Sequence, residues 1–146
     1  LGSETRIAVL NGVKAALSTA TTLTHLQASL QHKLSKNPQT IHYSGETVQV
    51  KNGFPIASWP HAIYPILDMN ASAINSNTND VCTGFDFCAS DDIDIHSPQF
   101  SKLNLNSGKL VVVWMQGDQL SDHCFAYFHQ PNSSKMPRSA IVSEGC

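Results

Sequence analysis

The chain has 146 residues, of which 41% are hydrophobic and only 14% charged, and its formal net charge is −2. This composition excludes wholesale disorder, because disordered chains are rich in charge and poor in apolar residues. With 9 basic against 11 acidic residues, the sequence has no basic surface of the kind that binds nucleic acid, and no apolar run spans a bilayer. We expect one domain over residues 4–146, with residues 1–3 as a remnant of an expression vector.

The segment 5–36 has the periodicity of one long α-helix. Its residues recur three and four positions apart in a largely apolar pattern, at Leu10, Val13, Leu17, Ala20, Leu23, Leu26 or Gln27, Leu30 and Leu34. Asn37-Pro38 is expected to end the helix, because a residue before proline avoids the α region. A helix of about 30 residues is far longer than the mean of about 11–12. We therefore expect it to be the spine of the fold or to project from it.

The middle of the chain, residues 37–108, is predicted to be a variable region rich in loops. Residues 40–50 have the pattern of a β-hairpin with its turn at Ser44-Gly45, and residues 53–58 are expected to be irregular. Residues 62–69 fit one short helix with Pro65 in its first turn. Residues 70–83 are rich in Asn, Ser and Thr, which indicates an exposed loop.

The C-terminal region, residues 109–146, has the pattern of antiparallel strands. Residues 110–115 are apolar and β-branched, which is typical of a central strand. Residues 123–129 alternate after a turn, so we expect them to pair antiparallel with that strand, and residues 140–142 add a short edge strand. The order of elements predicts an α+β fold, in which the long N-terminal α-helix packs on one face of an antiparallel β-sheet.

The four cysteines are Cys82, Cys88, Cys124 and Cys146. Their spacing lacks the Cys-x-x-Cys pairs of a structural zinc site, and a cysteine at the last position suits a crosslink that stops the chain end from fraying. We therefore predict two disulfides, Cys82–Cys88 and Cys124–Cys146, and an oxidising compartment. The alternative, four reduced and buried cysteines in a cytosolic protein, stays open at this point.

One acidic segment is the weak candidate for a metal site. If residues 92–96 form a strand, Asp92, Asp94 and His96 lie on one face and offer ligands for Ca²⁺ or another divalent ion. The alternative is a solvated edge strand whose Ile93 and Ile95 face the core. We favour that alternative and predict neither a metal nor another cofactor. The seven histidines are too widely scattered to share a metal ion.

The sequence indicates catalysis even less than it indicates metal binding. The sequence has no nucleophile elbow and no glycine-rich loop that would hold a phosphate, so we do not expect an enzyme. Trp114 lies in an apolar run and is predicted to be in the core. Trp59, next to Pro60, is predicted to be exposed and available for a surface contact.

Four features together resemble a known family. They are the helix Arg6-Ile7-Ala8-Val9-Leu10-Asn11-Gly12-Val13-Lys14-Ala15-Ala16-Leu17, the element Asn52-Gly53-Phe54-Pro55, the C-terminal strand pair, and the closing disulfide near the C-terminus. The chain resembles the headgroup of a type IV pilin, most nearly of the mannose-sensitive haemagglutinin type. The small Cys82–Cys88 loop departs from that pattern, since one C-terminal disulfide is usual in the family.

The resemblance implies a structural subunit of an extracellular type IV pilus in a Gram-negative bacterium, serving adhesion, biofilm formation or motility. The implied partners are identical pilin subunits in a helical filament and, before assembly, the inner-membrane assembly machinery. The apolar helix that anchors such pilins in the inner membrane would precede residue 1. In this family the long helix packs against neighbouring subunits, which implies filament contacts from Leu10, Val13, Leu17, Ala20 and Leu30.

Two alternatives stay open. A type II secretion pseudopilin or a minor pilin would share the fold, and calcium bound near Asp92 and Asp94 would favour the pseudopilin. A free secreted carbohydrate-binding module belongs to a different class of protein, and it would need a shallow aromatic groove that includes Trp59.

Overall fold

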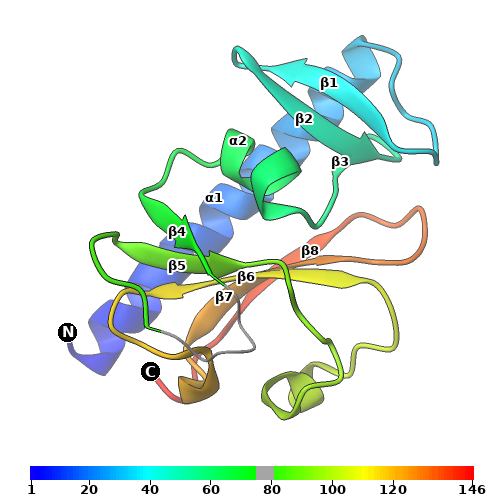
Figure 1. Cartoon of the computed structure of the whole chain (residues 1–146). Helices are drawn as coiled ribbons and strands as arrows, with labels where there is room; N and C mark the ends of the chain where they lie inside the picture. The colour runs from blue at the N-terminus through cyan, green and yellow to red at the C-terminus, as the bar shows by residue number, and fades with distance from the viewer. Residues whose placement is uncertain (75–80) are drawn as a thin grey trace.

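The computed structural model describes residues 1–74 and 81–146, and it has a mixed α+β fold (Figure 1). The helices are α1 (Ser3–Leu30) and the short α2 (Tyr64–Ile66). The strands are β1 (Gln39–Tyr43), β2 (Glu46–Lys51), β3 (Phe54–Pro55), β4 (Ala71–Ala73), β5 (Phe87–Ser90), β6 (Lys109–Met115), β7 (Phe125–Gln130) and β8 (Arg138–Val142). They form a three-stranded sheet in the order β1-β2-β3 and a five-stranded sheet in the order β4-β5-β6-β7-β8.

Helix α1 ends at Leu30 and not at residue 36 as predicted. The cause is a Schellman motif, in which His32 takes a left-handed conformation with a φ of 58°. The backbone N–H of Lys33 donates to the carbonyl of Ala28 at 2.8 Å and closes the helix end. Glycine usually occupies the left-handed position, so a histidine there gives no stop signal in the sequence. Pro38 lies in the loop that follows.

The three-stranded sheet confirms the predicted hairpin and extends it. β1 pairs antiparallel with β2 around Ser44-Gly45, as the sequence indicates. β3 lies in the segment predicted to be irregular, but it pairs antiparallel with β2. Asn52 and Gly53 between them both have positive φ, of 54° and 77°, which a tight two-residue hairpin turn requires.

The five-stranded sheet confirms the predicted C-terminal strands. β6 is central and pairs antiparallel with β5 and β7, and β8 pairs with β7 at one edge. β4 pairs parallel with β5 at the other edge, so the sheet is mixed and not antiparallel throughout. Because β4 falls within residues 70–83, the predicted exposed loop is wrong for that part. Residues 75–80 of that loop lie outside the described residues.

The helix predicted over residues 62–69 is confirmed only for residues 62–66, because it begins earlier and ends sooner. A π-helical turn, Trp59–Ile63, leads into the single helical turn α2, after which Leu67 is extended. The hydroxyl of Ser58 accepts a hydrogen bond from the backbone N–H of His61 and caps the first turn. Pro65 sits in the first turn of α2, where its missing N–H has no intrahelical partner to lose.

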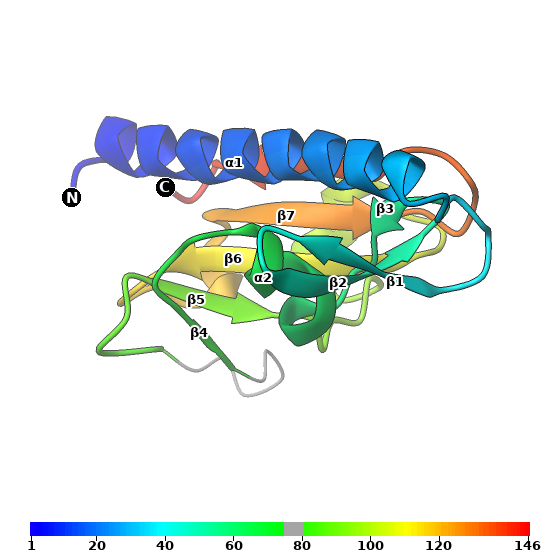
Figure 2. The same cartoon turned by 90° about the horizontal axis from the view of Figure 1, so that it is seen from above.

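Figure 2 shows α1 lying lengthwise over the sheets as an outer layer. Side chains alternate along β6, so Val111 and Val113 belong to the core beneath the helix, whereas Val112 and Trp114 belong to a second core on the opposite face. Phe100 covers that second core from a 3-10 turn, Pro98–Leu103. The central strand is therefore buried on both faces, which explains its continuous apolar run.

A ring stack joins α1 to the three-stranded sheet. The centroids of the Phe54 and His25 rings lie 4.1 Å apart, and the ring planes differ by 12°. Gly53 approaches the helix so closely that a β-carbon there would overlap the side chains of His25 and Leu34. The Gly-Phe-Pro element that contributes to the family resemblance therefore has a packing role at the end of α1.

Candidate functional site

Helix α1 packs one face against the chain's own sheets. The buried residues of this inner face are Leu10, Val13, Leu17, Ala20, Thr21, Thr24 and Ala28. Four of the five residues expected to make filament contacts are among them, so that expectation is corrected: their surface is already covered by the same chain. Only Leu30 of that set is exposed, because the buried stripe continues from Ala20 through Thr24 and Ala28 as the helix turns.

The outer face of α1 is exposed and uncharged. We use this name for the residues Gly12, Ala16, Thr19, Leu23, Leu26 and Leu30, which are spaced three or four apart. The exposed fractions of the three leucines are 44%, 53% and 66% in chain order. Residues 15–32 contain no Asp, Glu, Lys or Arg. A helix with apolar residues on both faces is normally covered on both, so this face has the character of an interface.

A groove borders the outer face. It has a volume of about 480 Å³, and Ala16, Thr19 and Leu23 form its helix wall. Ile66 and Leu67, after the π-helical turn, form the opposite wall together with Tyr43 of β1. The lining is mostly apolar, with the carboxylate of Asp68 as its one charged group, so the groove adds apolar surface beside the helix.

The two predicted disulfides are confirmed. Cys124 and Cys146 are joined with their Cα atoms 4.9 Å apart, and the Cα atoms of Cys82 and Cys88 are 5.7 Å apart. The first bond fixes the C-terminal segment beside β7, where the N–H of Gly145 also donates to the carbonyl of His123 at 2.9 Å. Paired cysteines are typical of oxidising compartments, so the alternative of four reduced cysteines is not supported.

Two ion pairs lie near the ends of the chain. Arg6 in the first turns of α1 pairs with Asp118 after β6, and its guanidinium lies 3.8 Å from the sulfur of Cys124. Both partners are largely buried, so this pair anchors the start of the helix. Lys102 hydrogen-bonds Glu144 at 2.7 Å, and this bond together with the lysine's charge lowers the pKa of the Glu144 carboxyl.

The candidate metal ligands do not share a strand face. β5 ends at Ser90, and a turn follows in which the backbone N–H of His96 donates to the carboxylate of Asp94 at 2.9 Å. The strand expected over residues 92–96 is therefore wrong, although Ile93 and Ile95 do pack against the second core. Across residues 1–74 and 81–146, no three His, Cys, Asp or Glu residues are grouped closely enough to hold a metal ion.

The two tryptophans are both in the core. Trp114 is buried as predicted, and its indole N–H donates to the carbonyl of Asp118 at 3.1 Å. Trp59 is only 5% exposed, so the predicted surface contact is corrected. The π-helical turn folds its ring inward, and its backbone N–H donates to Asp91 at 2.6 Å. Because the Trp59 ring is buried, it cannot form part of an aromatic sugar-binding platform on the surface.

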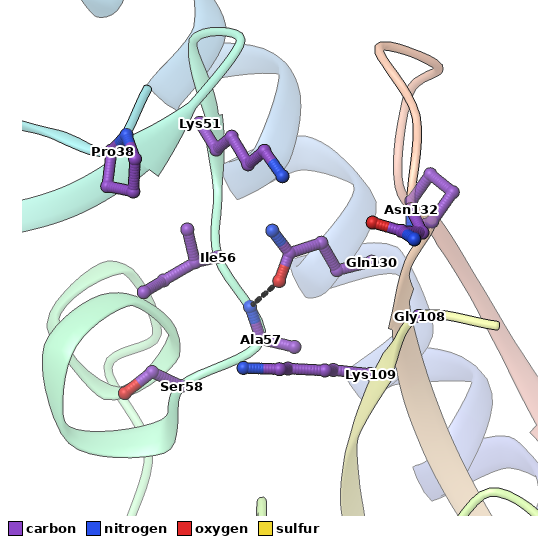
Figure 3. A pocket seen from close by; sticks show the side chains of 10 residues that line it. Pro38, Lys51, Ile56, Ala57, Ser58, Gly108, Lys109, Gln130 and Asn132 are labelled. Atoms are coloured by element: carbon purple, nitrogen blue, oxygen red, sulfur yellow. Dashed lines mark hydrogen bonds between the residues drawn. The ribbon is translucent and has the colours of Figure 1, made fainter. Parts of the chain in front are cut away.

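A pocket missed by sequence reasoning lies where the two sheets meet. We call it the junction pocket (Figure 3). It has a volume of about 440 Å³ and is lined by Pro38, Lys51, Ile56, Ala57, Ser58, Gly108, Lys109, Gln130, Pro131 and Asn132. These residues come from segments far apart in sequence, so only the tertiary fold brings them together. Its lining includes the ammonium groups of Lys51 and Lys109, which are hydrogen-bond donors only, and the amide of Gln130.

Within the described part of the chain, no helix has the length and apolar character needed to cross a membrane. Comparisons with protein-family models, curated proteins and solved structures find nothing that matches this chain.

Proposed function

We propose that the chain is the head of a subunit in an extracellular filament of the type IV pilus kind, built from identical copies. The observation that carries this proposal is the outer face of α1, which is exposed and uncharged and carries three large leucines. A second copy is the occupant that fits this face. The outer face itself brings no charged side chain into such a contact, so on its side the contact buries no unpaired charge.

Three other features support the same proposal. The long helix runs along the whole domain, and its first residues lie near the C-terminus at one end (Figure 2). The Cys124–Cys146 disulfide fixes that end, which suits a protein exposed to an oxidising medium. When the outer face contacts a different surface of the next copy, the contact is heterologous and propagates into a helical fibre. Adhesion, biofilm formation or motility would be the role of that fibre on a Gram-negative cell, after assembly by the inner-membrane machinery.

The direct test places a photo-crosslinking amino acid on α1 in the natural full-length protein on producing cells. At position 26 we expect ultraviolet light to give a ladder of covalent multimers that contain this chain alone. Ser18 is the matched control, because it is exposed on a different side of the same helix. A single monomer band at position 26, or equal ladders at both positions, would contradict assembly through the outer face.

A second variant pair tests whether the contact matters. Leu26→Lys puts a charge in the outer face, so we expect the amount of sheared filament seen by electron microscopy to fall at least tenfold. Ser18→Lys should leave it unchanged. Mass spectrometry of the native protein provides the independent check: a methylated phenylalanine followed by an apolar stretch that runs into Arg6-Ile7 is expected. A cleaved secretory signal leading straight into the helix would favour a secreted binding module.

A further inference from the structure

We propose that the junction pocket binds a small organic acid, about the size of one sugar ring, through the acid's carboxylate. This inference concerns a ligand and not assembly, and it does not rest on the proposed filament. None of the outer-face residues of α1 lines the pocket. It can therefore be tested on a single copy of the protein in solution.

The donors of the pocket converge from opposite walls. Figure 3 shows Lys51 of β2 and Lys109 of β6 extending into the pocket from two sides, with Gln130 of β7 between them. Among the described residues, neither ammonium group belongs to an ion pair, and no carboxylate lines the pocket. Two unpaired lysines facing one cavity make a site for one anion, because each ammonium offers a charge-assisted hydrogen bond.

The amide of Gln130 is already oriented for a ligand. Its side-chain oxygen accepts a hydrogen bond from the backbone N–H of Ala57 at 2.8 Å, so its NH₂ group points away from Ala57 (Figure 3). Gly108 lines the pocket next to Gln130, where a β-carbon would overlap the carbonyl of Gln130. The bond to Ala57 fixes the amide before any ligand arrives, which lowers the ordering cost of binding.

The shape of the pocket limits the class of ligand. Its volume of about 440 Å³ lies in the ordinary range for small-molecule sites. Ile56, Pro38 and Pro131 give it an apolar wall, which suits the carbon face of a ring next to the carboxylate.

The test is a titration of the ¹⁵N-labelled protein with sodium glucuronate, followed by nuclear magnetic resonance. We expect the backbone amide signals of Ala57 and Gln130 to shift in a saturable way, with a dissociation constant in the millimolar range. Glucose, which has the ring without the charge, and acetate, which has the charge without the ring, should each bind at least tenfold more weakly. Glucuronate binding no tighter than acetate would overturn the assignment of a ring-sized acid.

Variants locate the site. Lys51→Gln and Lys109→Gln should each weaken glucuronate binding roughly tenfold, since each removes one charge-assisted hydrogen bond. Lys14→Gln is the matched control, because Lys14 is an exposed lysine on α1 and does not line the pocket. Unchanged signals elsewhere in the spectrum show that each variant is folded. Binding that survives both pocket substitutions, or falls equally in Lys14→Gln, would overturn the proposal.

Discussion

The two faces of helix α1 carry similar side chains in opposite surroundings. Leu17 on the inner face is almost fully buried against the sheet, whereas Leu26 on the outer face is 53% exposed. The inner stripe continues past Leu17 with Thr21 and Thr24, although leucines are available nearby in the sequence. Beyond Ala20, the helix thus places threonines in the core and leucines in solvent. The exposed leucines add little to the stability of this domain alone. A second surface that covers them would explain why they are there.

The largest change in the free energy of unfolding is expected when one leucine on each face is shortened to alanine, and this pair of variants tests the comparison directly. Leu17→Ala leaves a cavity under the helix, so we expect it to lower the free energy of unfolding by about 3 kcal/mol. Leu26→Ala in the isolated chain should change it by no more than about 0.5 kcal/mol. Urea unfolding followed by circular dichroism measures both. Equal losses would show that the outer face is not a free surface in the single copy.

The second largest change in stability is expected where Gly53 packs against α1. Gly53→Ala should lower the free energy of unfolding by about 2 kcal/mol, because the residue has positive φ and crowds His25 and Leu34. Gly45→Ala is the matched control, since Gly45 has a similar φ of 80° and no neighbour within 4 Å. Its cost should be about 1 kcal/mol, from the backbone alone. Equal losses in the two variants would show that the contact with α1 carries no energy.

A third effect compares two threonines of the inner face. The hydroxyl of Thr21 donates to the carbonyl of Leu17 at 2.7 Å, whereas the buried hydroxyl of Thr24 has no hydrogen-bond partner among the described residues. Thr24→Val should therefore raise the free energy of unfolding by about 1 kcal/mol, because it removes a desolvated and unpaired group. Thr21→Val should lower it slightly. Thermal unfolding of both variants decides the sign, and a loss in Thr24→Val would contradict the expectation.

The sequence was sufficient for the elements whose signals are local. The hairpin of β1 and β2 has its turn residues at Ser44-Gly45, and the strands β6 and β7 have apolar or alternating patterns that a sheet requires. The disulfide pairing could also be predicted from the positions of the cysteines. Cys82 and Cys88 are close in sequence, and Cys146 at the chain end suits a crosslink to Cys124.

The elements that could not be predicted depend on contacts between distant segments. Periodicity located the apolar residues of α1 but not the stripe that meets the sheet, since leucines occur on both faces. Trp59 is buried because a π-helical turn folds inward, and such turns have no clear sequence signature. The junction pocket joins Lys51 and Lys109 across two sheets, so no spacing along the chain indicates it.

The smallest expected effect concerns an exposed ion pair, Lys102 and Glu144. It provides a reference for how little a surface ion pair contributes to the free energy of unfolding. The hydrogen bond and charge of Lys102 lower the pKa of Glu144 in the folded chain. The resulting stabilisation is complete above the ordinary pKa of a glutamate and is lost as the pH falls through the lowered value. Lys102→Met should therefore raise the pKa of Glu144, as measured by a carbon-detected magnetic resonance titration.

Lys14→Met removes an exposed lysine outside this pair and is the control, so it should leave the titration of Glu144 unchanged. The stability difference between Lys102→Met and the unaltered chain should be present at neutral pH, vanish in acid, and shrink at high salt, because surface charges are screened. A difference that persists in acid would mean that Lys102 stabilises the C-terminal segment by packing its aliphatic stem, as the leucines of the inner face do, and not by its charge.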